Sequence, residues 1–385
     1  MSVNVAMKPM YLSVLVLSVL SIAVCPLSGN AQESGAAENS APAGTDPRIG
    51  QRVIVTKAGA EMRTPDAIVW KAYLGEVFTV TLTNGEWLWI DEKGGWIWEK
   101  ETVLFNTAID ELSRRLTTTP TAESFHLRGV AFLAHQDYDK AIADFSESLR
   151  KSPGNAGALN NRGQASYLKG DYASAVQDFT AALAIDPKSF LFLNNRALAY
   201  IELENYSAAL ADLQSALTII PEYPEALNNR GIVFQKLNRL DEAIADFTAA
   251  LKIDPKYVDA LGNRSYTRQL KNDLPGAIAD LEMALKVNPL SYEAMNDLAW
   301  LLSTAASNSL RNGSRAVQLA TQACELTGNS QWNTLDTLAA AKAEVGDFEG
   351  ARQAIELSVQ LAPDQEKARL KGHQASISEK KPIRN

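Results

Sequence analysis

The stretch Leu159-Asn160-Asn161-Arg162-Gly163 returns three times at intervals of 34 residues. The later copies are Leu193-Asn194-Asn195-Arg196-Ala197, Leu227-Asn228-Asn229-Arg230-Gly231 and Leu261-Gly262-Asn263-Arg264-Ser265. A second motif of the type Ala-Ile-Ala-Asp-Phe keeps the same period and starts at residues 141, 243 and 277. Self-similarity at such a period indicates stacked structural units in which each unit contacts its neighbours, and not one globular core.

Each unit predicts two antiparallel helices. Small residues such as Gly163 and Ala175 stand early in the first helix and at the start of the second, where the helices cross closely. Larger residues such as Phe145 and Phe179 fill the space further along. A proline closes most units, because the residue before a proline avoids α geometry. The closing prolines are Pro153, Pro187, Pro221, Pro255, Pro289 and Pro363.

The pattern resembles the tetratricopeptide repeat, which implies a mainly α superhelical solenoid of antiparallel helix pairs. Seven copies fit residues 122–365, and the sixth has 40 residues because of an insertion near residues 305–314. We interpret that insertion as a tolerated loop, with a binding element as the alternative. Residues 106–121 predict a capping and connecting helix of the second type, and residues 366–385 a C-terminal cap and tail.

Residues 48–105 show a hydrophobic period of two, which predicts five short strands beginning with Arg52-Val53-Ile54-Val55. Asn84-Gly85 and Gly94-Gly95 are strong signals for tight hairpins. The stretches Gly59-Ala60-Glu61-Met62-Arg63, Gly75-Glu76-Val77, Asn84-Gly85-Glu86-Trp87-Leu88-Trp89-Ile90 and Gly95-Trp96-Ile97 resemble the bacterial SH3-like domain. The resemblance implies a small all-β barrel that binds peptides or cell-wall fragments through an aromatic groove.

The SH3-like barrel contains five of the seven tryptophans of the chain. Alternation places Leu88 and Ile90 on one face of their strand and Trp87 and Trp89 on the other. If the aliphatic face is the core, Trp87, Trp89, Trp96 and Trp98 form a partly exposed aromatic groove. The alternatives, weighed equally with the groove, are an interface with the neighbouring helices or a tryptophan-rich core.

The repeat resemblance also implies a binding surface on the concave face, lined by the first helices. Carried over position by position, this surface comprises His126, Val130, Leu133, Asn160, Gln164, Tyr167, Asn194, Leu198, Ile201, Asn228, Ile232, Gln235, Tyr266, Gln269, Asn296, Trp300 and Ser303. The Lys/Arg/Asn set by which some members of the family clamp a C-terminal carboxylate is missing at these positions. We therefore expect a partner segment of mixed polar and apolar character.

Two series of charged residues recur in phase with the repeat: Arg128, Arg162, Arg196, Arg230 and Arg264, and Asp144, Asp178, Asp212, Asp246 and Asp280. Their equal numbers and equal period favour structural Arg–Asp pairs between helices over a charged ligand track. The series Asn161, Asn195, Asn229 and Asn263 predicts side-chain-to-backbone bonds between repeats.

Composition and motifs argue against catalysis and nucleic-acid binding. The net charge of −8 lacks the basic excess of a nucleic-acid-binding protein, and two cysteines and three histidines leave little material for metal sites. No catalytic or phosphate-binding fingerprint is present. We expect no cofactor, no bound metal and no enzymatic activity.

Residues 1–31 resemble a signal peptide, with an apolar run from Met10 to Val24 and a small residue, Ala31, before the cleavage site. The alternatives are an uncleaved membrane anchor and lipidation at Cys25. Residues 32–47 predict a flexible linker. No second apolar run of spanning length follows, so we expect export to the periplasm, the cell envelope or the extracellular space, without a membrane span after cleavage.

Together these features predict an exported, non-enzymatic adaptor or scaffold that binds protein or peptide partners in the groove of the repeats. The SH3-like barrel would supply a second site, including for a cell-wall fragment. The alternative is a cell-wall or envelope-binding protein in which the barrel is the binding module and the repeats are a spacer.

Overall fold

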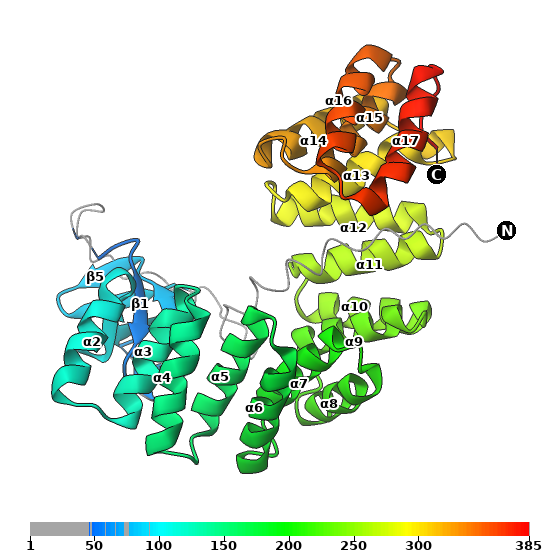
Figure 1. Ribbon diagram of the computed structural model, residues 1–385. Helices are drawn as coiled ribbons and strands as arrows, with labels where there is room; N and C mark the ends of the chain where they lie inside the picture. The colour runs from blue at the N-terminus through cyan, green and yellow to red at the C-terminus, as the bar shows by residue number, and fades with distance from the viewer. Residues whose placement is uncertain are drawn as a thin grey trace. The chain divides into compact units, whose positions relative to one another are not determined.

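The computed structural model describes residues 46, 48–57, 59–65, 67–72, 77–91 and 93–384. The predicted signal peptide and nearly all of the predicted linker lie outside these residues. The described residues contain eight strands and sixteen α-helices, so the fold is mainly α with a small β region before it, as predicted (Figure 1). They divide into two compact units, one ending at Ile220 and the other beginning at Pro221. A linear array has no single core, so a division can fall between two repeats.

The strands form two antiparallel sheets with the orders β4-β1-β8 and β3-β2-β7-β6-β5. Their bounds are β1 Arg52–Val55, β2 Ala60–Arg63, β3 Ile68–Ala72, β4 Val77–Thr79, β5 Leu82–Asn84, β6 Trp87–Ile90, β7 Gly95–Trp98 and β8 Thr102–Leu104. The prediction of five strands was too low. The run 77–82 divides because Val80 bonds with Gly50 and Gln51 in one sheet, whereas the N–H of Thr81 donates to Trp89 in the other.

The core of the barrel is aliphatic. Leu88, Ile90 and Ile97 are almost fully buried and pack with Met62, Phe78 and the valines of β1. Gly85 and Gly94 take positive φ angles of 61° and 62° in the turns on either side of β6, a conformation that costs glycine little. The sequence signals for tight hairpins at these two places are therefore correct.

The helices alternate between the two types that the sequence repeat predicts. Their bounds are α2 Ala108–Thr118, α3 Ala122–Ala134, α4 Tyr138–Lys151, α5 Ala156–Lys169, α6 Tyr172–Ile185, α7 Phe190–Glu202, α8 Tyr206–Ile219, α9 Pro224–Lys236, α10 Leu240–Ile253, α11 Val258–Leu270, α12 Leu274–Val287, α13 Tyr292–Thr304, α14 Gly313–Leu326, α15 Trp332–Glu344, α16 Phe348–Leu361 and α17 Asp364–Ser378. We call the first helix of each repeat its A helix (α3 to α15, odd numbers) and the second its B helix.

Side-chain caps start most of the B helices. Asp137, Asp171, Asn205 and Asp273 each accept a hydrogen bond from the backbone N–H three residues further on. Such caps satisfy one of the backbone donors that a helix leaves free at its first turn. The insertion of the sixth repeat lies between α13 and α14, where residues 305–312 connect the two helices through a short 3-10 turn, Asn308–Leu310.

Within a hairpin, the A and B helices fit by size. A Cβ added to Gly231 would lie 2.6 Å from the ring of Phe247, and one added to Gly129 or Gly163 would lie 2.8 or 2.9 Å from the ring of Phe145 or Phe179. Where the A helix carries Ala197 or Ser265, the residue sixteen positions later is Leu213 or Leu281. The glycine therefore makes room for an aromatic ring, and a slightly larger residue is matched by leucine.

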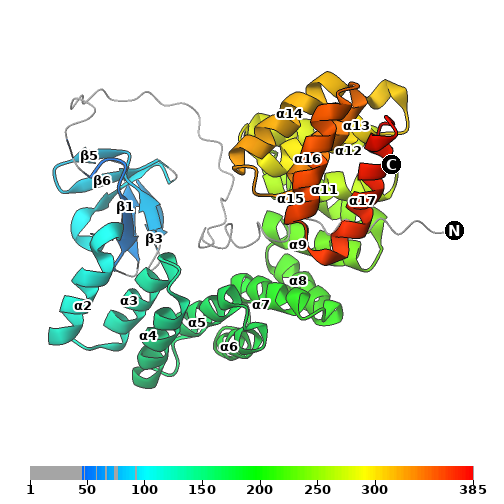
Figure 2. The same cartoon turned by 45° about the horizontal axis from the view of Figure 1, so that its top comes forward.

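The barrel and the first repeat share one apolar cluster. Ile54 and Val103 of the barrel pack with Leu112 of α2 and with Leu127 and Val130 of α3. Figures 1 and 2 show the strands beside α2 and α3. Helix α2 thus covers the open side of the first repeat, in the place that the preceding B helix takes in a complete array.

Candidate protein-binding surfaces

Each arginine of the recurring series forms two parallel hydrogen bonds with the aspartate sixteen residues later. The pairs Arg128–Asp144, Arg162–Asp178, Arg196–Asp212, Arg230–Asp246 and Arg264–Asp280 have N–O distances of 2.6–3.0 Å. Each pair joins the A and B helices of one hairpin. The structural interpretation of the two charge series is confirmed, and these residues do not form a free ligand track.

Four of these arginines also bond to the hairpin before their own. Their Nη1 atoms donate to Ser113, Ser146, Thr180 and Thr248 at 3.0–3.2 Å, each on the preceding B helix. Arg128 reaches Ser113 on α2, which shows that α2 takes part in the stack as a B helix does. One guanidinium therefore fixes three helices and holds the A helices in register.

Three of the four recurring asparagines, Asn161, Asn195 and Asn263, donate to side chains, so the prediction of side-chain-to-backbone bonds was wrong at these three positions. Asn195 Nδ2 donates to Asn160 Oδ1 at 2.9 Å, and Asn263 Nδ2 donates to Asn228 Oδ1 at 3.0 Å. At the first repeat, the amide of Asn161 donates to His126 Nε2 at 3.3 Å. Side chains of neighbouring A helices face each other at a spacing of 34 to 35 residues. Each amide therefore lies closer to a polar side chain of the neighbouring A helix than to its backbone.

The structure places the predicted groove residues on the A helices. Three of them take part in the polar contacts just described, since His126, Asn160 and Asn228 each accept a hydrogen bond from the next A helix. Most of the set are buried in the isolated chain: His126, Val130, Leu133, Asn160, Gln164, Tyr167, Asn194, Leu198, Ile201, Asn228, Ile232, Asn296, Trp300 and Ser303. Gln235, Tyr266 and Gln269 are half-buried. Their role in binding stays a prediction.

Several buried polar atoms on these A helices have no hydrogen-bond partner in the described part of the chain. They include Nδ1 of His126, Oδ1 of Asn296 and Nε1 of Trp300. Burial lowers the pKa of His126 to about 4, so its ring is neutral at pH 7. Because Asn161 donates to Nε2, the proton of this neutral ring lies on the unpartnered Nδ1.

Three carboxylates in the unit after Pro221 escaped the sequence analysis. Glu225, Asp259 and Glu293 stand in the first turns of α9, α11 and α13, and their 34-residue spacing was the signal that could have revealed them. Burial raises the pKa of Glu225 and of Asp259, and the nearby Glu293 carboxylate raises the pKa of Asp259 further. Among the described residues, neither Glu225 nor Asp259 has an ion-pair partner. We call these three residues the acidic stripe.

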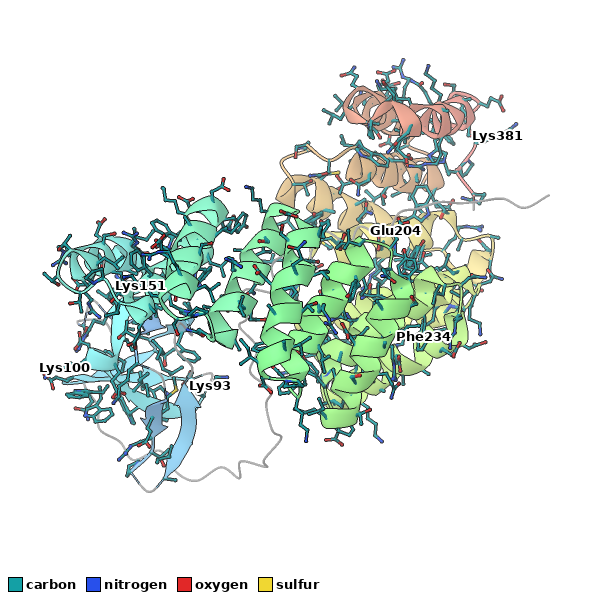
Figure 3. The ribbon with its side chains drawn as sticks, turned by 60° about the horizontal axis from the view of Figure 1, so that its bottom comes forward. Lys93, Lys100, Lys151, Glu204, Phe234 and Lys381 are labelled. Carbon is teal, nitrogen blue, oxygen red and sulfur yellow. The ribbon has the colours of Figure 1, made fainter. Side chains whose placement is uncertain are left out.

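The four tryptophans predicted as an aromatic groove lie together on the outer face of the larger sheet. Strand register sets Trp87 opposite Trp98 and Trp89 opposite Trp96, and the rings of Trp89 and Trp96 meet edge to face at 5.2 Å. Trp87 is 40% exposed. Lys100, labelled in Figure 3, lies 4.9 Å from the centre of the Trp98 ring. These side chains form a surface that we call the tryptophan face.

The tryptophan face belongs neither to the barrel core nor to the contact with the helices. The core is built from Leu88, Ile90 and Ile97, and the contact with the first repeat uses Ile54 and Val103. Polar groups at the rim fix two of the indoles: Asp91 accepts a hydrogen bond from Trp89 Nε1, and Glu86 accepts one from Trp98 Nε1. Trp87 is exposed and Trp89, Trp96 and Trp98 are half-buried, so the partly exposed position is the one observed, and ligand binding there stays a prediction.

The remaining chemistry-bearing residues are engaged in packing. His135 stacks on Phe105 at 4.2 Å, and His373 Nδ1 lies 2.8 Å from Asp336 Oδ1. Cys324 is buried, which raises the pKa of its thiol. No group of three or more metal-binding side chains occurs among residues that the structure describes. Within the same residues, every helix is too short or too polar to cross a bilayer.

Family models for the tetratricopeptide repeat match residues 126–190, 197–238 and 224–257. The chain contains tetratricopeptide repeats. Proteins built from these repeats are generally non-catalytic adaptors that bind protein or peptide partners, so the fold points to a protein–protein interaction scaffold. The β region before the tetratricopeptide repeats is consistent with an SH3-like domain. No curated protein matches the chain.

Several solved structures are similar to the chain, and one of them, the APC/C hetero-tetramer Cut9-Hcn1, is similar enough to show the same fold over the matched residues. The APC/C hetero-tetramer Cut9-Hcn1 is 18% identical over 62% of this chain and 46% of that chain, with a TM-score of 0.53. A tetratricopeptide repeat protein from Parabacteroides merdae is 20% identical over 67% of this chain and 98% of that chain, with a TM-score of 0.46. YrrB, a TPR protein with an unusual peptide-binding site, is 22% identical over 49% and 98% of the two chains, with a TM-score of 0.39. The match with Cut9-Hcn1 spans less than half of the chain compared.

Proposed function

We propose that this protein is an exported, non-enzymatic adaptor that binds partner segments along the A helices of its tetratricopeptide repeats. The observation that supports this most directly is that buried polar atoms of His126, Asn296 and Trp300 on those helices have no hydrogen-bond partner among the described residues. A buried donor or acceptor that lacks a partner costs free energy, and the backbone of a bound peptide can supply the missing hydrogen bond.

The barrel contributes a second binding site in this proposal. The tryptophan face offers rigid aromatic side chains with polar groups at their edges, as recognition surfaces commonly do. Two weak contacts, one on the barrel and one on the repeats, would act together through a raised effective concentration. The N-terminal signal-like stretch supports export to the periplasm, the cell envelope or the extracellular space.

A binding experiment on the full chain tests the adaptor function. Wild type, the double variant Tyr266→Ala/Gln269→Ala and the control Lys252→Ala are used to capture proteins from envelope extract. Tyr266 and Gln269 lie on an A helix and are half-buried, whereas Lys252 is exposed on the B helix α10. We expect specific partners with wild type and the control and their loss with the double variant. Equal capture by all three proteins would contradict binding at these positions.

A wall-binding function is the second candidate, because the tryptophan face can stack on the rings of sugars. Its test is cosedimentation of the full chain with purified cell-wall sacculi. The double variant Trp89→Ala/Trp96→Ala is compared with Tyr266→Ala/Gln269→Ala. If only the tryptophan variant loses sacculi and no protein partner is captured, the barrel is the binding module and the repeats are a spacer.

A further inference from the structure

Residues 379–384 fold back from the end of α17. Lys380 has a positive φ of 55°, and the backbone N–H groups of Lys380 and Lys381 donate to the carbonyls of Ile377 and Ser376. This pattern is the Schellman ending of a helix, which reverses the direction of the chain. Lys381, labelled in Figure 3, marks the returning segment, and Figures 1 and 2 show the end of the chain beside α13.

The returning segment is seated on the A helices of repeats six and seven. Ile383 is 5% exposed and belongs to the buried apolar cluster of Trp300, Ala340 and Ala343. Arg384 Nη1 donates to the carbonyl of Ser303 at 3.2 Å. These contacts hold one aliphatic side chain in an apolar site and one guanidinium at its edge.

The guanidinium of Arg384 forms an ion pair with the carboxylate of Glu344. Arg384 Nη2 lies 2.6 Å from Oε2 of Glu344 on α15, and the other oxygen of Glu344 accepts from Arg311 of the inserted loop at 2.9 Å. Glu344 is therefore largely buried between two arginines, one of which belongs to the returning segment. The insertion of the sixth repeat thus helps to position the carboxylate that Arg384 contacts.

The site that residues 379–384 occupy includes predicted groove positions. Trp300 and Ser303, both expected from the repeat resemblance to line the groove, are the residues that the segment covers or contacts. A stretch of the chain itself therefore lies where a partner segment is expected.

We infer that residues 379–384 are a resident ligand of the A-helix face of repeats six and seven, and that an extended peptide with an aliphatic residue followed by arginine displaces them. This inference rests on the proposed function, since it names the class of partner that the groove takes. The segment serves as a template for the partner, because its Ile383 and Arg384 show which side chains the site accepts.

The charges of the same unit favour a basic partner. The acidic stripe lies on the A helices α9, α11 and α13, and the segment carries Lys380, Lys381 and Arg384 within five residues. Burial raises the pKa of Glu225 and of Asp259, and the carboxylates of Asp254 and Glu293 add like-charge repulsion at Glu225 and Asp259, respectively. A cationic peptide on this face would offset the repulsion that these carboxylates experience from their acidic neighbours.

Two buried polar atoms, one on Trp300 and one on Asn296, indicate that the backbone of the partner peptide forms hydrogen bonds in this site. Nε1 of Trp300 can only donate and Oδ1 of Asn296 can only accept, and both are buried without a partner within the described chain. They lie four residues apart on α13 and therefore on one face of that helix. A carbonyl and an N–H of an extended peptide would satisfy the two atoms together.

Direct binding in trans tests the inference. The probe is a fluorescein-labelled synthetic peptide of residues 378–384, and fluorescence anisotropy is measured with the full chain as wild type, Ile383→Asp and Arg384→Glu. Lys371→Glu is the control, because Lys371 is exposed on α17 and the charge change is the same as in Arg384→Glu. A second peptide, with aspartate in place of isoleucine, tests the apolar site.

We expect Ile383→Asp and Arg384→Glu to bind the labelled peptide at least tenfold more tightly than wild type and Lys371→Glu, because the resident segment no longer competes. The aspartate peptide should not bind. If Ile383→Asp alters the circular dichroism spectrum, Arg384→Glu, which retains the buried isoleucine, decides the question alone.

Two results would overturn the inference. One is that the folded variants bind the peptide no better than wild type, and the other is that both peptides bind equally, which would indicate charge attraction alone. Either result can occur while wild type still captures partners that Tyr266→Ala/Gln269→Ala loses. In that case the adaptor function stands and the resident-ligand inference fails.

Discussion

Arg162 and Asp178 lie sixteen residues apart on the two helices of one hairpin and join through two hydrogen bonds of 2.8 and 2.6 Å. Arg162 also donates to Ser146 of the preceding hairpin at 3.1 Å. The guanidinium is planar and matches a carboxylate in a bidentate arrangement. Its remaining N–H groups are free for the neighbouring hydroxyl, so one side chain sets both the hairpin and the stacking of hairpins.

Asp178→Asn should lower the free energy of unfolding by about 1–3 kcal/mol, because it removes the charge that faces a partly buried guanidinium. The measurement is urea denaturation followed by circular dichroism. Asp139→Asn is the control, since Asp139 is exposed and pairs with the exposed Lys169; it should change the value by less than about 0.5 kcal/mol. Equal effects of the two substitutions would show that the bidentate pair adds nothing.

Gly231→Ala should destabilise the fourth repeat by about 1–3 kcal/mol, because the new methyl group would meet the ring of Phe247 at 2.6 Å. The double variant Gly231→Ala/Phe247→Leu should recover part of this loss, since the third repeat already combines Ala197 with Leu213. A double-mutant cycle on denaturation midpoints measures the coupling. Additive effects of the two substitutions would contradict the size match.

Leu88→Ala and Trp87→Ala separate the core of the barrel from its tryptophan face. Leu88 is almost fully buried, so its truncation should cost about 2–5 kcal/mol. Trp87 is 40% exposed and pairs across strands with Trp98, so its truncation should cost about 1 kcal/mol or less. Thermal unfolding monitored by tryptophan fluorescence compares them. A larger loss for Trp87→Ala would place the tryptophans in the core.

His126→Phe should make stability less sensitive to acid. The folded pKa of His126 is about 4, below its usual 6.5, so the unfolded chain binds more protons between these values. The contribution of His126 is therefore complete above pH 6.5 and is lost as the pH falls through 4. The unfolding midpoints of wild type and His126→Phe are measured from pH 7 to pH 4. As the pH falls, the midpoint of wild type should decrease more than that of the variant. A constant difference would refute the burial of a neutral ring.

The period of 34 residues predicts the helices and the Arg–Asp pairs, because two series with equal spacing must meet at every hairpin. It does not predict the partner of each asparagine, since a period shows that side chains recur but not which neighbour each one meets. Strand β2 escaped prediction because Met62 is its one large apolar residue, β8 because it has only three residues, and β5 because Leu82 continues the apolar run that begins at Val77. The chain reversal at residues 379–384 depends on one left-handed residue, Lys380, and on one buried isoleucine, Ile383. Neither residue belongs to the 34-residue pattern, so the pattern could not predict the reversal.

Because four of the recurring arginines each join three helices, the array keeps its hydrogen bonds only when whole repeats are added or removed. If residues 156–189 were removed, Ser146 would face Arg196 in place of Arg162, and His126 would face Asn195 in place of Asn161. Arg196 would meet a hydroxyl oxygen as it did before, and the amide of Asn195 would meet an imidazole nitrogen in place of an amide oxygen. Gene duplication or loss of one or more 34-residue segments can therefore lengthen or shorten the protein and keep these bonds, whereas a change by a length that is not a multiple of 34 moves the bonded residues out of register.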